Sequence, residues 1–261
     1  MEFVEANGIR IAYERGGTGP LLLLAHGAAS DHRMWRPQLD GLTGDFTVVA
    51  WDEPGAGESG EVPGDFQLED YAACLATLID ELALGPAHLA GLSWGGTVVL
   101  ELYRCRPDLV STLILADSYA GWKGSLSQEE VDARIALAQE MLSAPAEEFN
   151  PELPGLFAGD PPTEFIPLLS EIAAAVRPES LRMQLTAMAE ADLRDLLPLV
   201  AAPTLLIWGE LDARSPLAVA HQLGEAIPGS RLVVLPRCGH VSNLERPALF
   251  NQTVREFAIG P

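Results

Sequence analysis

The chain has 261 residues and 48% hydrophobic content, which fits one α/β-sized domain, or a core with an insertion, and supplies apolar surface for a large core. Its formal net charge of −21 repels phosphate backbones and anionic lipid surfaces, so we expect neither nucleic acid nor a membrane as a partner. The three cysteines are odd in number and form no C-x-x-C pair, which argues against a disulfide framework and a structural zinc site.

We expect no targeting signal in the N-terminal segment. Residues 1–5 contain no positive charge, and the longest early apolar run, residues 21–25, is far too short for a signal peptide or a membrane-spanning helix. We therefore expect a soluble, cytoplasmic protein. Nothing in the sequence predicts an oligomeric state.

The first part of the chain alternates strand-like and helix-like segments. Two segments with alternating polarity flank Asn7-Gly8, which is the strongest short-range signal for a two-residue hairpin. The unbroken apolar runs that follow are typical of parallel strands buried on both faces. We expect strands at residues 3–6, 9–14, 21–25, 47–51, 87–90 and 111–116, and helices at about 34–42 and 68–84.

The pattern changes at residue 120, because no strand candidate occurs between residues 120 and 198. Ser127 and Glu130 form a capping box ahead of a predicted helix, and Pro178 is placed to begin another. Later segments predict a short helix after 163, strands at 204–208 and 232–235, and helices from about 215 and at about 243–257. We predict a helical cap at residues 120–198 that divides the core into residues 1–119 and 199–261.

A glycine-flanked serine stands between one predicted strand and the helix after it, in the sequence G-L-S-W-G. Ser93 at so sharp a turn adopts a strained backbone, and the residues two before and two after it must lack bulk. Gly91 and Gly95 meet that demand. This pattern is a nucleophile elbow, although a bare G-x-S-x-G also arises by chance in a chain with 24 glycines. A histidine and a carboxylate in the right order would strengthen it.

A serine hydroxyl needs a base to take its proton, and His240 is our candidate. It lies in a glycine-bearing loop after the last predicted strand, from which a side chain can reach back over the sheet. His88 falls inside a strand and His221 on a helix, so we expect both to be structural or surface residues, and His32 lies near the start of the first core helix. Cys238 stands close to His240, but no second pair of ligands is present, and we expect no metal.

The third member of such a group is a carboxylate that fixes the tautomer of the histidine. Asp212 follows a strand and precedes His240 by 28 residues, giving the order Ser, Asp, His. Asp117, after the preceding strand, is the rival. The alternative for Asp212 is a turn or N-cap residue before Ser215.

Acyl transfer also needs backbone N–H donors for the oxyanion. The elbow template supplies one from the residue after the nucleophile, Trp94, and one from a loop after an earlier strand, where Ala28 is our candidate. His26 would then shape that loop instead of acting as a base.

Five motifs stand in a fixed order along the chain. They are His26-Gly27, residues 52–59 (DEPGAGES), the elbow, residues 208–212 (WGELD) and residues 238–240 (CGH). In this order the chain resembles the α/β-hydrolase family over essentially its full length. The resemblance implies a mostly parallel eight-stranded sheet flanked by helices, with a helical cap inserted after the sixth strand. Residues 239–247 are similar to the ending of 3-oxoadipate enol-lactonases, and related esterases and carbon–carbon bond hydrolases share much of that ending.

These residues predict a serine hydrolase without a cofactor that cleaves a small, neutral carboxylic ester or lactone through an acyl-enzyme. We expect Trp122, Met183 and Met188 of the cap to contact the substrate. The cap contains five basic residues against fourteen acidic ones, which favours an uncharged substrate. The alternatives are a diketone carbon–carbon bond hydrolase using the same three residues, and a non-catalytic ligand-binding protein. Relatives with dehalogenase or epoxide hydrolase chemistry carry aspartate where Ser93 stands.

Overall fold

The N-terminal hairpin predicted around Asn7-Gly8 is present in the computed structural model, which describes residues 1–144, 149–151 and 154–260. Strand β1 (Glu2–Ala6) pairs antiparallel with β2 (Ile9–Gly16). Asn7 and Gly8 have φ values of 52° and 82°, and a type I′ turn requires positive φ at both central residues.

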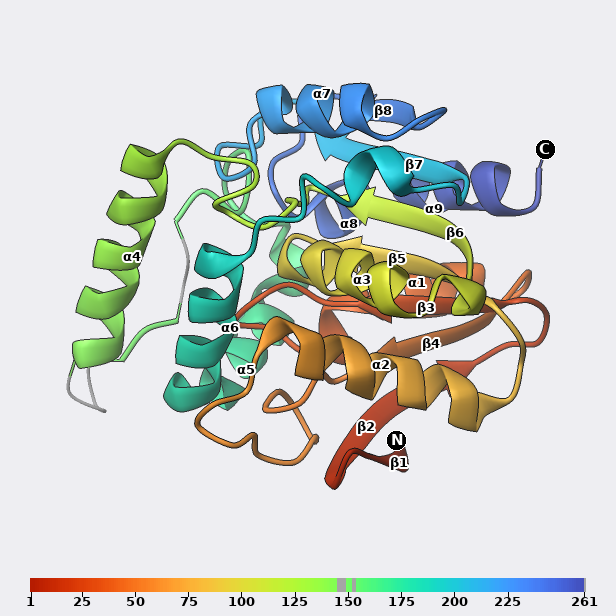
Figure 1. Ribbon diagram of the computed structural model, residues 1–261, viewed down its shortest axis with the longest axis horizontal. Helices are drawn as coiled ribbons and strands as arrows, with labels where there is room; N and C mark the ends of the chain where they lie inside the picture. Colours follow the sequence, from red (N-terminus) through yellow and green to blue (C-terminus); the bar gives the residue numbers. More distant parts are fainter. Residues whose placement is uncertain (145–148, 152–153, 261) are drawn as a thin grey trace.

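In the described part of the chain, eight strands form one sheet in the order β1-β2-β4-β3-β5-β6-β7-β8 (Figure 1). The first two strands are antiparallel to their neighbours, and the six from β3 to β8 are parallel to one another. The six are β3 (Leu21–Ala25), β4 (Thr47–Trp51), β5 (Ala87–Leu92), β6 (Val110–Ala116), β7 (Thr204–Gly209) and β8 (Arg231–Leu235). The predicted fold class, α/β with a mostly parallel eight-stranded sheet, is confirmed.

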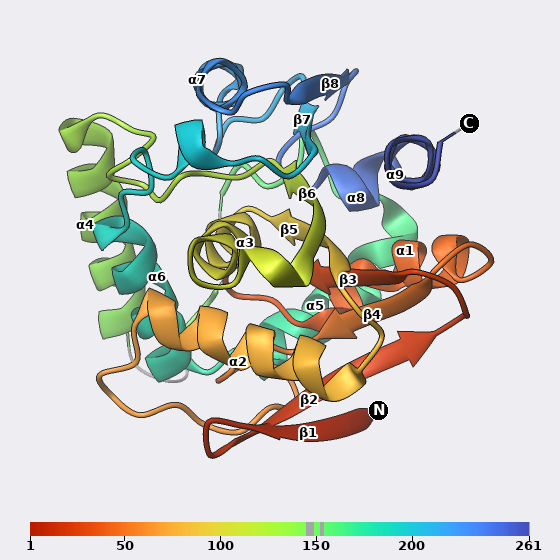
Figure 2. The ribbon, with the colours of Figure 1, turned by 45° about the vertical axis from the view of Figure 1, so that its right-hand side comes forward.

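Alternate residues of the central strands enter two separate apolar cores, one on each face of the sheet. Leu21 and Leu23 point into one core and Leu22 and Leu24 into the other, because successive side chains of a strand point to opposite faces. Helices α2 (Leu68–Leu82), α3 (Trp94–Cys105) and α7 (Leu217–Ala226) cover the first face. Helices α1 (Arg36–Leu42), α8 (Ser242–Glu245) and α9 (Pro247–Ala258) cover the second (Figure 2).

Two predicted helices are broken. The final one, expected from about 243 to 257, consists of α8 and α9, and Arg246 between them has non-helical angles of φ −135° and ψ 53°. Pro247 is the reason, since a proline disfavours the α conformation of the residue before it. The first helix likewise begins as a 3₁₀ turn, His32–Trp35, ahead of α1.

A group of helices lies between β6 and β7, in the segment for which the sequence predicts a cap. They are α4 (Gln128–Ser143), α5 (Ile166–Ala175) and α6 (Pro178–Glu190). The Ser127 hydroxyl accepts from the Glu130 N–H at 3.3 Å, and the Glu130 carboxylate accepts from the Ser127 N–H at 2.9 Å, so the capping box is formed. Helices α4 and α6 lie beyond the ends toward which the parallel strands point (Figure 1). Among the described residues, no helix combines the length and the apolarity that a membrane crossing requires.

Candidate active site

Ser93 occupies the sharp turn between β5 and α3 that its sequence context predicts. Its φ of 53° and ψ of −114° are strained for a residue with a side chain. A Cβ atom on Gly91 would lie 2.4 Å from the Gly95 carbonyl oxygen, and one on Gly95 would lie 2.2 Å from the Ala25 carbonyl oxygen. Both positions therefore need glycine, because α3 lies too close to β5 at Gly91 and to β3 at Gly95 for a side chain.

His240 is bonded at both ring nitrogens, and it joins Ser93 to Asp212. Its Nε2 lies 2.9 Å from Ser93 Oγ, and its Nδ1 lies 2.9 Å from Asp212 Oδ2. In the neutral imidazole one nitrogen donates and the other accepts. A carboxylate can only accept, so we assign the proton to Nδ1, which leaves Nε2 free to accept from the serine hydroxyl.

Burial is the main influence on the proton affinity of this histidine. His240 is 2% exposed, and its desolvation lowers the pKa of the imidazole, although the charge and hydrogen bond of Asp212 act in the opposite direction. The lowered pKa favours the neutral ring at physiological pH. A neutral imidazole bonded to a serine hydroxyl is able to act as a general base.

Asp212 makes the contacts of both alternatives that its sequence context left open, one with the histidine and one within a turn. Its Oδ2 bonds to His240, while its Oδ1 accepts from the N–H groups of Arg214 and Ser215, each at 2.8 Å. The turn-forming bonds thus hold the carboxylate in place for the histidine.

Asp117, the rival carboxylate, has other partners. Its Oδ1 accepts from the Gly209 N–H at 2.8 Å and its Oδ2 from the Ser242 N–H at 3.4 Å. Burial, followed by the nearby charge of Asp212, raises the pKa of the Asp117 carboxyl well above its usual range. Asp117 therefore ties the end of β7 to the start of α8.

The two predicted oxyanion donors, Trp94 and Ala28, belong to different segments near Ser93. Trp94 is the first residue of α3, and N–H groups in a first helical turn have no partner within the helix. Ala28 lines the same cavity as Ser93 and His240. His26 bonds the Gly27 carbonyl at 2.8 Å through Nδ1, and its Nε2 lies 3.2 Å from the Glu53 N–H, in keeping with its expected role of shaping this loop.

The cavity beside Ser93 has mostly apolar walls. The side chains that supply them are Met34, Leu92, Trp122, Leu156, Leu185, Met188 and Val241. Two of the predicted substrate contacts, Trp122 and Met188, are therefore placed against the cavity. Met183 does not line it, and packs half-buried against the core instead.

Sequence reasoning missed most of the cavity wall, including two residues with polar side chains, Tyr119 and Arg214. The Tyr119 hydroxyl donates to the Arg214 carbonyl at 2.5 Å. Tyr119 comes two residues after Asp117 at the carboxyl end of β6, so a search of strand ends extended by two positions would have found it.

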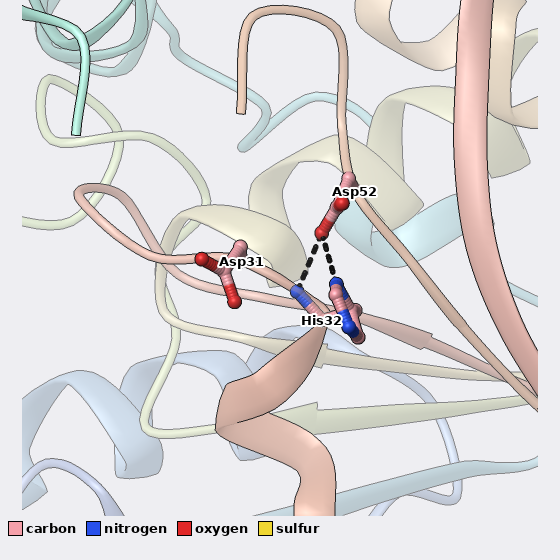
Figure 3. A group of neighbouring side chains, drawn as sticks. All are labelled: Asp31, His32 and Asp52. Atoms are coloured by element: carbon pink, nitrogen blue, oxygen red, sulfur yellow. Dashed lines mark hydrogen bonds and ion pairs between the residues drawn. The ribbon is translucent and has the colours of Figure 1, made fainter. Parts of the chain in front are cut away.

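Asp31, His32 and Asp52 are close enough together to hold a metal ion, but their polar atoms have other partners (Figure 3). Asp52 Oδ1 accepts from the backbone N and the Nδ1 of His32, both at 2.7 Å, and its Oδ2 accepts from the Glu58 N–H at 2.8 Å. The Asp31 carboxylate binds the Arg33 guanidinium at 2.7 and 2.9 Å. Although burial opposes it, Asp52 raises the pKa of His32. These hydrogen bonds fix the 3₁₀ turn at the start of the first helix.

The sheet order, the elbow and the chain order Ser93, Asp212, His240 define the class of this protein as an α/β-hydrolase. The comparison with protein families agrees, since residues 22–253 match the model of the Alpha/beta hydrolase family. The chain belongs to that family.

Hydrolases and esterases are among its relatives. The chain is 29% identical to a putative carbamate hydrolase RutD of Pseudomonas savastanoi pv. phaseolicola, over 91% of this chain and 93% of the relative. Among solved structures, a thermophilic esterase from Thermogutta terrifontis has a TM-score of 0.84 at 31% identity, covering 98% of this chain and 97% of its own. The enol-lactonase from Burkholderia xenovorans LB400 has a TM-score of 0.81 at 27% identity, with 98% and 99% covered. The protein is an enzyme of the α/β-hydrolase family.

Proposed function

We propose that the protein is a serine hydrolase that cleaves a small, neutral carboxylic ester or lactone. The observation that carries this proposal is the doubly bonded imidazole of His240, which lies 2.9 Å from Ser93 Oγ and 2.9 Å from Asp212 Oδ2. This arrangement activates a serine hydroxyl and lets a carboxylate stabilise the imidazolium that forms.

In the proposed reaction, Ser93 Oγ attacks the carbonyl carbon while His240 Nε2 takes the hydroxyl proton. The negative charge moves to the carbonyl oxygen, which accepts from the N–H groups of Ala28 and Trp94. The carbon–oxygen bond to the leaving group then breaks, and His240 returns the proton to that alcohol oxygen. A water molecule, deprotonated by the same imidazole, releases the acid and restores the serine.

We further propose that residues 120–198 form a cap that selects the substrate, with residues 1–119 and 199–261 as the catalytic core. Helix α6 supplies Leu185 and Met188 to the cavity, and Trp122 comes from the segment that leads into α4. Such apolar walls suit an uncharged acyl chain or ring. The net charge of −21 supports a small-molecule substrate and argues against nucleic acids and anionic membranes as partners.

Covalent labelling tests the role of Ser93. A serine-directed phosphonate should add once, on Ser93 as located by peptide mass mapping, and should abolish steady release of a chromogenic alcohol from an aryl ester. Ser93→Ala should lower kcat on the order of 10³-fold or more and prevent labelling. Ser111→Ala is the matched control, because Ser111 Oγ is exposed and donates to the Pro86 carbonyl far from the elbow. Labelling of another residue in an active enzyme would disprove the assignment.

A panel of lactones, aryl esters and diketones separates the proposal from its alternatives. Turnover of a diketone alone would indicate carbon–carbon bond hydrolysis by the same three residues. Binding of panel members without any turnover would indicate a ligand-binding protein.

A further inference from the structure

Glu53 is a buried carboxyl group that the proposed mechanism does not use. It lies two residues beyond β4 and is 1% exposed. Its Oε2 accepts from the indole Nε1 of Trp94 at 2.7 Å, and its Oε1 accepts a short hydrogen bond from the Nε2 of Gln184. Glu53 therefore joins the first residue of α3 to helix α6 of the cap, which lies 131 residues further along the chain.

The direction of these hydrogen bonds follows from the partners. The indole nitrogen of Trp94 can only donate. Gln184 Oε1 accepts from the Ala29 N–H at 3.2 Å, which fixes the orientation of the amide and turns its NH₂ group toward Glu53. Both Glu53 oxygens are thus acceptors. Burial raises the pKa of Glu53 well above its usual range, and the bond from Trp94 opposes that shift.

One partner of Glu53, Trp94, carries a proposed oxyanion donor, and the other, Gln184, accepts a hydrogen bond from the segment that carries the second donor. Trp94 supplies one donor through its own backbone, and its ring is also held edge-on by Tyr71 at 5.3 Å. The other donor, the Ala28 N–H, precedes Ala29, whose φ of 56° lies in the left-handed region that residues with side chains rarely adopt. The bond from Ala29 to Gln184 holds this strained position.

The backbone of Glu53 makes a third contact with the same region. Its N–H donates to His26 Nε2 at 3.2 Å, so the ring proton is on Nδ1, which donates to the Gly27 carbonyl at 2.8 Å. The Gly27 carbonyl and the Ala28 N–H belong to one planar peptide unit. Fixing the carbonyl therefore fixes the direction in which the Ala28 N–H points.

We propose that Glu53 is a positioning residue for the oxyanion hole, which it holds in place through Trp94 on one side and through Gln184 and Ala29 on the other. This inference rests on the proposed function. It also gives the cap a part in positioning the oxyanion hole, because Gln184 belongs to helix α6. The next residue of that helix, Leu185, lines the cavity. Loss of one oxyanion donor costs about 10²–10³ in kcat, so a displaced donor should have a measurable effect.

A side-chain exchange between Glu53 and Gln184 provides the test. Glu53→Gln sets two amide NH₂ groups against each other, and we expect kcat for an aryl ester to fall about 10²-fold while KM stays within about threefold. Gln184→Glu sets two carboxyl groups against each other and should cost a similar factor. The double exchange restores a complementary pair, with acceptors still facing Trp94 and Ala29, and should return kcat to within about tenfold of the parent.

A boronic acid that forms a tetrahedral adduct with Ser93 distinguishes positioning from a general loss of structure. Its inhibition constant should weaken in parallel with kcat across the variants, since the adduct needs the oxyanion hole. Glu101→Gln is the matched control: Glu101 is also a buried glutamate, 4% exposed, and it bonds Arg104 on the outer part of α3. It should leave both constants unchanged.

The inference is overturned if folded Glu53→Gln keeps kcat within about threefold of the parent. It is also overturned if the folded double exchange recovers nothing. If Glu53→Gln fails to fold, Gln184→Met provides the test, because it leaves the bond between Glu53 and Trp94 intact. An unchanged kcat in Gln184→Met would contradict the proposal. Full turnover by Ser93→Ala would overturn the proposed function as well. If Ser93→Ala instead loses activity while Glu53→Gln keeps the kcat of the parent, only this inference is overturned.

Discussion

His240 Nε2 lies 2.9 Å from Ser93 Oγ, although 147 residues separate the two in the sequence. The contact brings the loop after β8 back over the turn between β5 and α3. It depends on the whole sheet, because each residue follows the carboxyl end of a parallel strand. These carboxyl ends all lie on the same side of the sheet.

Asp212→Asn should slow turnover far more than Asp117→Asn. An amide at position 212 can hold the imidazole in the wrong tautomer and cannot stabilise its charged form, so we expect kcat to fall on the order of 10⁴-fold with the fold intact. Asp117→Asn loses an acceptor for the N–H of Gly209 or Ser242 and should instead lower the free energy of unfolding by about 1–3 kcal/mol. Steady-state kinetics and urea unfolding of both variants check this. If Asp117→Asn instead lowered kcat more than Asp212→Asn, Asp117 would be the carboxylate that orients His240.

The pH dependence of kcat/KM should reflect the effect of burial on the pKa of His240. The base acts only when neutral, so kcat/KM should rise with pH through the pKa of this group and then level off. Because burial lowers that pKa, the midpoint should lie below the ordinary histidine value of 6.5. His32→Gln should leave the midpoint in place, since His32 bonds Asp52 and not the triad. A midpoint above 6.5 would contradict the assigned environment.

Gly95→Ala should destabilise the protein strongly, because the new methyl group would lie 2.2 Å from a backbone carbonyl oxygen. We expect the free energy of unfolding to fall by about 3 kcal/mol or more. Gly224→Ala, on helix α7, is the control: its methyl group would lie 3.5 Å from Leu206 Cδ1, an ordinary contact, and helix propensity favours alanine by about 1 kcal/mol. Urea unfolding should rank Gly224→Ala, parent and Gly95→Ala in that order of decreasing stability.

A neutral lactone or aryl ester should have a higher kcat/KM than a matched carboxylated one, with the difference shrinking as salt screens the acidic cap. Arg214 is the cation on the cavity wall, and its Nη1 donates to the Pro154 carbonyl at 3.0 Å. A carboxylated substrate that wins by tenfold at low salt would contradict the neutral-substrate proposal. Arg214→Gln would then show whether this guanidinium is responsible.

The sequence predicted features that depend on neighbouring residues. The Asn7-Gly8 hairpin, the capping box at Ser127 and the elbow at Ser93 each rest on the chemistry of a few adjacent positions, and each is present. The buried strands were also predictable, because a strand covered on both faces is apolar throughout. Pro247 could have predicted the break at Arg246. We predicted one continuous helix there because the apolar pattern continues across the end of α8.

Contacts between distant segments were decided by the tertiary structure. Asp117 and Asp212 both follow strands of the same parallel edge, and only the path of each loop determines which carboxylate meets His240. Met183 and Met188 lie on one helix, but only Met188 lines the cavity, because the packing of α6 selects which of its faces does so. Residue identity and spacing determine local conformation and the candidate groups, whereas the meeting of two side chains depends on how the sheet and the cap are packed.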